Sequence, residues 1–492
     1  MESSSRAFAL LRAHWVLLAL LVPAVALRLT AMAGYPPALW FWADSFSYLR
    51  DPAPGTFRPA GYSLFLALLR PLHSLALVTA VQHLIGLAVG VSVYALLHRR
   101  GLPGWGAALL VSPILLDEFL ILAEHMIMAD AQFLALVTGA VLALLAGRYG
   151  LAGALLAAAT LTRTIGLPVL VIGLAYALIQ VASGHRARRR LVALGLTALL
   201  PIGGYLAWSG LTTGAYTLTG ADGMFLWART MSFADCAVIR PRDTRLCPGL
   251  PVGQRPAPAF WVWGPKLKQF PSKERNARAG AFARAAILAQ PGDYLAAVAK
   301  DLGQVLRWER TEPPRVGGRR NPYHFPLAER PVQDEIAERY ERGPAATRLV
   351  APYTGWLRGY QRWGYLPYPM VMAVLAAAAT LAAVRRRWEA LLPVAVALAL
   401  IVLPPLLTGW DVRYVIPAIP LACLALGLAL STGPQPQEAT GDARHRRRHA
   451  QAGDPRPPGS GHRPRAAEAG FLRRLRRAPG QALRAGDRRP GH

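Results

Sequence analysis

Acidic and basic side chains stand beside long apolar segments at four places in this chain. Asp44 lies in FWADSFSYLR, directly after the first apolar segment, and Asp130 ends the stretch EHMIMAD. Arg163 lies in LTRTIGLP, and Asp411 and Arg413 lie in GWDVRYVIP. A charged group at the centre of a bilayer costs about 2.5–3.5 kcal/mol on insertion scales, so charges within or at the edge of apolar segments indicate a function.

Carboxylates and guanidinium groups together suit the transfer of a sugar from a phosphate. A carboxylate can take the proton from an attacking hydroxyl, and arginines hold phosphate oxygens bidentately. Paired carboxylates beside an anomeric carbon are the usual device of glycosyl chemistry. Trp42, Tyr48 and Tyr62 could stack on sugar faces, although an interfacial aromatic belt accounts for them equally well. The residue types indicate a sugar–phosphate–lipid donor at the membrane surface.

Each charged residue also has a structural alternative. A charge near a membrane surface can cap a helix, pair with a neighbour or extend to lipid headgroups. The alternatives are Asp44 as a cap or anchor, Asp130 as an N-cap, Arg163 reaching headgroups, Glu124 pairing with His125 or facing water, and Arg413 pairing with Asp411. Their common placement on one predicted face favours the functional interpretation.

The composition is that of an all-α polytopic membrane protein. Of the 492 residues, 53% are hydrophobic and 17% are charged, and the apolar residues come in blocks rather than in periodic stripes. Blocks of about twenty apolar residues are what a bilayer requires. We predict ten spans: 14–33, 74–97, 104–121, 130–147, 149–161, 163–182, 191–210, 366–384, 389–407 and 413–431. The region 149–182 could instead be one long broken span. The first could instead be a cleavable signal peptide, but its length favours an uncleaved span.

Arginine clusters predict the orientation of the chain. The formal net charge of +28 is concentrated in short junctions between spans and in the last sixty residues, which fits positive-inside topology and not nucleic-acid binding. The junctions are RAHW (12–15), HRR (98–100), GR (147–148), HRARRR (185–190) and RRRW (385–388). Counting spans puts all five, and both termini, in the cytoplasm. The charged motifs then face the outside of what the Ala-, Arg-, Pro- and Gly-rich composition indicates is a bacterial plasma membrane.

Four regions follow from this topology. They are an N-terminal transmembrane module (1–210) with a first outer loop (34–73), an extracytoplasmic segment (211–365), C-terminal spans (366–432) and a basic tail (433–492) that we predict to be disordered. Part of the tail, 471–485, could instead form a basic helix on the inner leaflet. Two helices are expected at 272–290 and 291–308 in the extracytoplasmic segment.

The three cysteines fit an oxidising outer compartment. Cys236 and Cys247 lie in the extracytoplasmic segment, where a disulfide is expected, with two free thiols as the alternative. Cys423 lies in an apolar block and fits a small buried residue.

The series of motifs resembles that of the C-type (GT-C) glycosyltransferases, integral membrane enzymes that use polyprenyl-phosphate sugars. Within that group it is most similar to the protein O-mannosyltransferase and aminoarabinose-transferase branch. The similar segments run in the family's order from residue 41 to about 421: WADSFSYL, FRPAGYSLFLALL, EHMIMADAQF, LTRTIGLPVL, AAILAQPGDYLAAV and DVRYVIPAIPL.

The resemblance implies a fold, an activity and a set of site residues. The fold would be a helical bundle of about ten spans, against eleven to thirteen in many relatives, with juxtamembrane helices and a mainly helical extracytoplasmic segment. The activity would be inverting transfer of a sugar to a glycan, lipid or protein hydroxyl at the outer face. Asp44 would be the general base and Asp130 the second acid, with substrate-binding residues Arg58, Tyr62, Glu124, His125, Arg163, Arg413 and Tyr414.

Two departures from the family pattern bear on the site. Ser45 stands where many members carry a second acid, which weakens the expectation of a divalent cation, Mg²⁺ or Mn²⁺. Arg58 stands where some relatives carry an acid or a lysine.

Two other classes of protein remain as alternatives to an enzyme. A transporter or flippase for a lipid-linked sugar also needs charges within the membrane, but it usually shows inverted repeats, which this sequence lacks. A non-catalytic scaffold would leave the one-sided acidic and arginine motifs without an explanation.

Overall fold

The fold was analysed in a computed structural model, which describes residues 2–50, 52–181, 185–308, 323–329 and 335–433. Within these ranges every regular element is a helix, and an isolated bridge pairs Leu39 with Met126. In the described part of the chain, five helices are long and apolar enough to cross a membrane, or six if the bent pair Gly104–Leu116 and Glu118–His125 is one span. The basic tail, including 471–485, lies outside the described residues.

Every predicted span contains an apolar helix. These helices are α1 (Glu2–Gly34), α4 (Leu75–Arg99), α5 (Gly104–Leu116), α6 (Glu118–His125), α7 (Asp130–Leu145), α8 (Tyr149–Thr162), α9 (Gly166–Val181), α10 (His185–Thr213), α19 (Tyr368–Val384), α20 (Leu391–Leu407) and α21 (Ala418–Leu430). Helices α7, α8, α9 and α19 have 14 to 17 residues, fewer than a straight crossing needs. The count of ten crossings stays a prediction.

The predicted span 104–121 is bent. Its two helices meet at an angle of 47° at Asp117, whose backbone is extended. The Asp117 carboxylate accepts hydrogen bonds from the backbone amides of Phe119 and Leu120. These are N–H groups of the first turn of α6 that have no partner within the helix. Because Asp117 caps α6 within this apolar segment, the segment forms two helices and not one straight helix.

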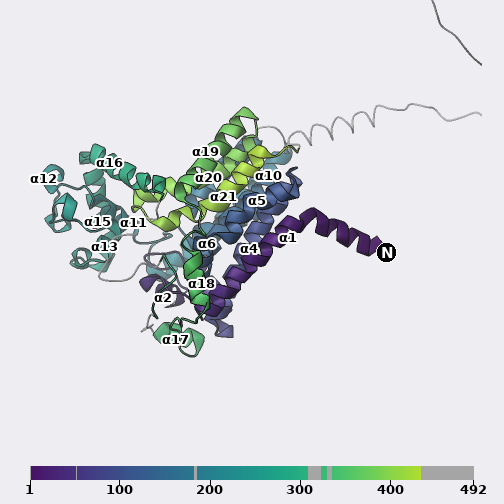
Figure 1. Ribbon diagram of the computed structural model, residues 1–492. Coiled ribbons are helices and arrows are strands. Elements are labelled where there is room, and N and C mark those ends of the chain that lie inside the picture. Colours follow the sequence, from purple (N-terminus) through teal and green to yellow (C-terminus); the bar gives the residue numbers. More distant parts are fainter. Residues whose placement is uncertain (1, 51, 182–184, 309–322, 330–334, 434–492) are drawn as a thin grey trace, which may run out of the picture. The chain divides into compact units, whose positions relative to one another are not determined.

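The apolar helices pack side by side around a shared core. Helix α10 packs along α8, and α8 packs along α7. Helices α19 and α20 both lie against α21 (Figure 1). Helix α21 is the most enclosed candidate span, with 83% of its most apolar window buried inside the protein. The C-terminal span is therefore a central element of the bundle and not a peripheral anchor.

The five predicted cytoplasmic junctions are linked by contacts at one end of the bundle. His14 hydrogen bonds to Tyr94 at 2.6 Å, and its ring lies 5.1 Å from that of His98. Arg100 forms a buried ion pair with Glu389 and donates to the carbonyl of Leu145. The Arg190 guanidinium lies 5.9 Å from the Tyr149 ring. The clusters therefore share one end, as positive-inside topology requires, although which side of the membrane it faces stays a prediction.

The predicted first outer loop (34–73) contains two short helices, α2 (Trp42–Arg50) and α3 (Gly61–Leu69), followed by η1 (Arg70–Leu72). Later segments add α17 (Glu335–Glu341), α18 (Tyr353–Tyr360), η5 (Trp388–Ala390) and η6 (Val412–Val415). Helix α2 contacts α3 and α17, while α3 contacts α8. The loop is therefore packed on other elements and is not a free connection.

The segment after α10 has its own apolar core. Helix α11 (Asp222–Thr230) packs against α15 (Ser272–Ala289) and α13 (Pro258–Trp263), and it buries Trp227 completely. The remaining elements are α12 (Cys236–Ile239), η2 (Thr244–Leu246), η3 (Val252–Gln254), α14 (Pro265–Lys268), α16 (Pro291–Leu302) and η4 (Gly303–Leu306). The helices predicted at 272–290 and 291–308 are present, although the second changes to a 3₁₀ helix after Leu302.

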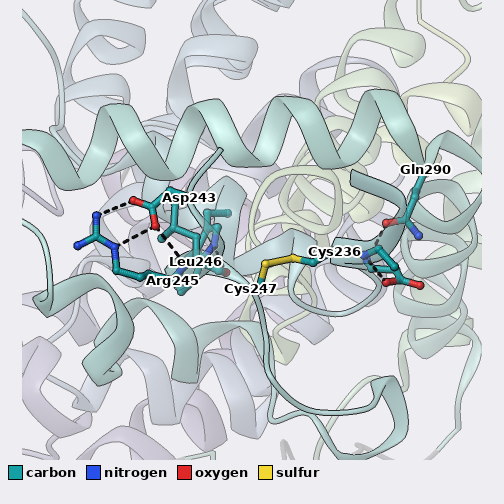
Figure 2. Close-up of a disulfide and its surroundings, with 9 residues drawn as sticks. Cys236, Asp243, Arg245, Leu246, Cys247 and Gln290 are labelled. Atoms are coloured by element: carbon teal, nitrogen blue, oxygen red, sulfur yellow. Dashed lines mark hydrogen bonds and ion pairs between the residues drawn. A yellow bond between two sulfur atoms is a disulfide. The ribbon is translucent and has the colours of Figure 1, made fainter. Parts of the chain in front are cut away.

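A disulfide joins Cys236 to Cys247 in this segment, with the two Cα atoms 6.1 Å apart (Figure 2). On one side of it, the amide of Asp235 donates to the Gln290 side chain at 2.8 Å. On the other side, Asp243 pairs with Arg245. The disulfide therefore links α12 to the end of η2, and the Gln290 contact attaches this loop to the joint between α15 and α16.

Candidate functional site

Asp44 lies in the first turn of α2 and is not its cap. The Oγ of Ser45 accepts the Phe41 amide at 2.9 Å at the start of the helix. The Asp44 carboxylate instead pairs with Arg58 through Oδ1 and lies 3.7 Å from Arg413 through Oδ2. Two guanidinium groups therefore neutralise the predicted base in this structure.

Arg58, between α2 and α3, connects this part of the first outer loop to Asp44. It also donates to the backbone oxygen of Asp44 and to the hydroxyl of Ser47. Its guanidinium stacks over the Tyr48 ring, 4.7 Å from the centroid. Arg58 therefore fixes α2 from one side and presents its charge beside the carboxylate.

Arg413 contacts two carboxylates at once. Besides Asp44, its Nε lies 3.4 Å from Asp411, so the pairing of neighbours considered for the sequence is present. The Tyr323 hydroxyl donates one hydrogen bond shared between the two Asp411 oxygens, at 2.6 and 2.7 Å, and Asp411 caps η6 by accepting the Arg413 amide. The Arg413 guanidinium lies 4.9 Å from the Phe41 ring. The segment that contains Asp411 and Arg413 therefore brings a guanidinium from the C-terminal part of the chain to Asp44.

Asp130 forms an ion pair with Arg163. The N-cap position of α7 is Ala129, with no side-chain cap, so the capping alternative for Asp130 is wrong. Arg163 lies in the extended break between α8 and α9, and its guanidinium is 5.7 Å from the Phe133 ring. The second acid therefore has a guanidinium partner, as the first does.

A close backbone approach brings the first outer loop to this second pair. A Cβ on Gly61 would lie 2.5 Å from the carbonyl oxygen of Leu161 and 2.9 Å from the amide of Thr162. Only glycine allows the start of α3 to lie so close to the residues before Arg163.

The two ion pairs act on the same phenol, Tyr48. Burial raises the pKa of Tyr48; Arg58 and Arg163 lower it, and Asp44 and Asp130 raise it. A single buried ring thus lies within the electrostatic reach of both acids and both guanidiniums. The structure therefore brings together the motifs at 44, 58, 130, 163 and 413.

Tyr62, Glu124 and His125 are buried behind these groups. The hydroxyl of Tyr62 donates to Gln82 at 2.7 Å, and the Glu124 carboxylate accepts two hydrogen bonds from Arg28 at 2.8 and 2.9 Å. Glu124 and His125 do not pair with each other, and neither faces water. These three side chains are enclosed, so in this structure they support the site, and the expectation that they bind substrate stays a prediction.

His83 and His125 belong to a buried network of polar side chains. His83 contacts Glu124 at 2.9 Å and His125 at 3.1 Å, and His125 contacts the carbonyl of Tyr35 at 3.0 Å. A Cβ on Gly86 would lie 1.7 Å from the Glu124 carboxylate, so that glycine makes room for the acid. Breaking a buried ion pair typically costs about 3–5 kcal/mol, so this network is expected to hold α1, α4 and α6 together.

Sequence reasoning missed Arg28, Gln82, His83 and Tyr323. The first three lie in predicted spans, and a charged or polar residue in an apolar run was the signal available for them. Tyr323 had no such signal, because its partner Asp411 is 88 positions away. Tyr414, predicted to bind substrate, lies 6.0 Å from the Arg413 guanidinium, and its hydroxyl is 3.4 Å from Thr408.

The donor set does not favour a resident metal ion. Among the described residues, no three His, Cys, Asp or Glu side chains are placed to share one. Asp44 has a guanidinium at each carboxylate oxygen, and Ser45 is used as a cap. The expectation of a divalent cation stays a prediction.

Comparisons with known proteins leave the family unassigned. No family model, no curated protein and no solved structure matches this chain.

Proposed function

We propose that this protein is an integral membrane glycosyltransferase of the cell envelope. It would transfer a sugar from a polyprenyl-phosphate donor to an acceptor hydroxyl at the extracytoplasmic face. The observation that carries the proposal is Asp44, held between Arg58 and Arg413 beside a second acid–arginine pair, Asp130 and Arg163. An acid among three guanidiniums is suited to a reaction that needs a base next to a phosphate.

The charged groups are accessible enough to exchange partners. The Asp44 and Arg413 side chains are each 18% exposed, whereas Glu124 and Arg28 are 6% and 3% exposed. A phosphate could therefore replace a carboxylate as the partner of Arg413 and Arg58, which would release Asp44 to accept a proton. The same exchange is closed to the buried Arg28–Glu124 pair.

In the proposed reaction the acceptor oxygen attacks the anomeric carbon and its proton passes to Asp44. The bond between that carbon and the phosphate oxygen breaks, with its electron pair staying on the oxygen, and the configuration at the carbon inverts. Arg163 and Arg413 stabilise the charge that develops on the leaving phosphate. Asp130 orients Arg163 through their ion pair.

The test is transfer activity in membranes supplied with a polyprenyl-phosphate sugar. Asp44→Asn keeps the size of the side chain but removes its basicity, and general-base catalysis is worth roughly 10²–10⁴-fold. We expect a loss in that range. The matched control is Asp243→Asn, which breaks the Asp243–Arg245 ion pair near the disulfide and should leave transfer unchanged. Full activity of Asp44→Asn would overturn the assignment of the base.

A further inference from the structure

Gln82 joins the two acidic motifs through one buried amide. It lies on α4 and is completely buried. Its Nε2 donates to the backbone carbonyls of Glu124 and Met126, both at 2.8 Å, and its Oε1 accepts from the Tyr62 hydroxyl at 2.7 Å. One side chain thus contacts the segment that leads to Asp130 and the helix that follows Arg58.

Only an amide fits these three partners. Two carbonyl oxygens require two N–H donors, and a phenol hydroxyl requires an acceptor, which is the donor and acceptor set of glutamine. A carboxylate here would place its oxygen against two carbonyl oxygens, and an apolar side chain would leave both carbonyls buried without a donor.

On one side, the segment 124–127, whose carbonyls accept hydrogen bonds from Gln82, is held by further contacts and leads to Asp130. The Glu124 side chain is fixed by Arg28 and His83. The following residues pair with the chain before α2, since the Leu39 amide donates to His125 at 3.0 Å and the Ile127 amide donates to Leu39 at 3.1 Å. Movement of 124–127 would therefore be transmitted both to Asp130 and to the entry of α2.

On the other side, the contacts run through aromatic rings to Asp44. The Tyr62 ring packs edge-on against Tyr48 with centroids 4.9 Å apart, and the Arg58 guanidinium covers Tyr48. Arg58 then pairs with Asp44. Gln82 is therefore the point at which the supports of the two acids meet.

We infer that Gln82 is a positioning residue that sets the separation of the two acidic motifs. Its effect on the reaction rests on the proposed function, whereas its effect on the backbone does not. The two consequences can be measured separately.

The backbone consequence is measured by hydrogen–deuterium exchange of the purified full-length protein in detergent. In Gln82→Leu and Gln82→Glu, peptides covering 124–130 and 35–44 should exchange faster than in the wild type. Tyr62→Phe removes only one of the three hydrogen bonds and serves if the Gln82 variants do not fold. The control is Thr138→Val, a buried change on α7 whose hydroxyl has no hydrogen-bond partner among the described residues. It should leave both peptides unchanged.

The catalytic consequence is a fall in kcat of roughly 10–100-fold with the donor KM within about twofold, because displacement of reacting groups by about 1 Å can cost 10²-fold. Gln82→Glu, although isosteric, should be as impaired as Gln82→Leu, which a packing role alone would not produce. Unchanged exchange, or altered exchange with an unchanged kcat, would overturn the inference. If the wild type transfers no sugar, the proposed function fails. Faster hydrogen–deuterium exchange in the Gln82 variants would still support the role of Gln82 in holding the two backbone segments.

Discussion

At the scale of single residues, Arg413 makes contacts that depend on both the charge and the planar shape of its side chain. Its guanidinium lies near Asp44 and Asp411 and stacks on Phe41, so its planar shape is used as well as its charge. Lysine would keep the charge but lose the planar fork and the stacking.

We therefore predict that Arg413→Lys raises the donor KM by roughly 10–100-fold, the equivalent of about 1.5–3 kcal/mol for a hydrogen bond to a charged group. The measurement is transfer rate against donor concentration. Arg339→Lys, which changes an exposed ion pair with Glu335, is the control and should leave the donor KM unchanged. Equal effects in both variants would contradict a phosphate-binding role for Arg413.

The sequence was most informative about residues that lie next to their partners in the chain. The Asp411–Arg413 pair is two positions apart, so the sequence alone suggests it. Glu124 was assigned wrongly among its alternatives because Arg28 is 96 positions away and His83 is 41 away. Patterns in the chain show that a buried charge needs a partner, but not which helix supplies it.

At the scale of elements, α16 attaches the outer segment to the loop that carries Asp411. Asp301 on α16 pairs with the buried Arg229 of α11 at 3.1 Å and accepts the Trp410 amide at 3.2 Å. Burial raises the pKa of Asp301, while Arg229 and the Trp410 amide lower it in part.

The raised pKa predicts a sign for the pH dependence of stability. The folded protein binds the Asp301 proton more tightly than the unfolded chain does. The stabilisation is fully present below the ordinary aspartate pKa of about 3.9 and is lost as pH rises through the raised value. The Tm of the wild type minus that of Asp301→Asn should therefore fall as pH increases from about 4.

Asp243 supplies the opposite case. Its hydrogen bond to Arg245 lowers the pKa of Asp243, so its contribution is present above the ordinary value and is lost as pH falls through the lowered one. The Tm difference between the wild type and Asp243→Asn should rise with pH. The same slope for both variants in thermal unfolding scans would contradict the assigned causes.

Element positions followed well from apolar blocks, and breaks within them did not. All ten predicted spans contain a helix, because burial in lipid or protein requires satisfied backbone groups. The bend at Asp117 was missed, since its cap depends on where one side chain turns. Apolar length alone also could not separate a full crossing from the shorter helices α7, α8, α9 and α19.

At the scale of the whole molecule, the arginine junctions that contact one another define one end of the helix bundle. The charged residues of the candidate site lie in other segments between the helices. Positive-inside orientation would place the junctions in the cytoplasm. Cysteine labelling in intact cells tests this, because the native cysteines are either in the disulfide or buried.

We expect Val252→Cys, at an exposed position near the disulfide, to react with an impermeant maleimide in intact cells. Ala146→Cys, beside the GR junction, should react only after the membrane is opened. Both side chains are exposed in the described part of the chain, so neither result would reflect burial. The reverse pattern would place the site on the cytoplasmic side and overturn the proposed topology.

Ser45 has an evolutionary consequence. It is fully buried, and its hydroxyl accepts the amide of Phe41, the residue before α2, so an acid introduced there would place a charge in an enclosed position. The packing at the start of α2 therefore disfavours a second acid beside Asp44. An acid at position 45 would need a compensating change that gives its charge a partner.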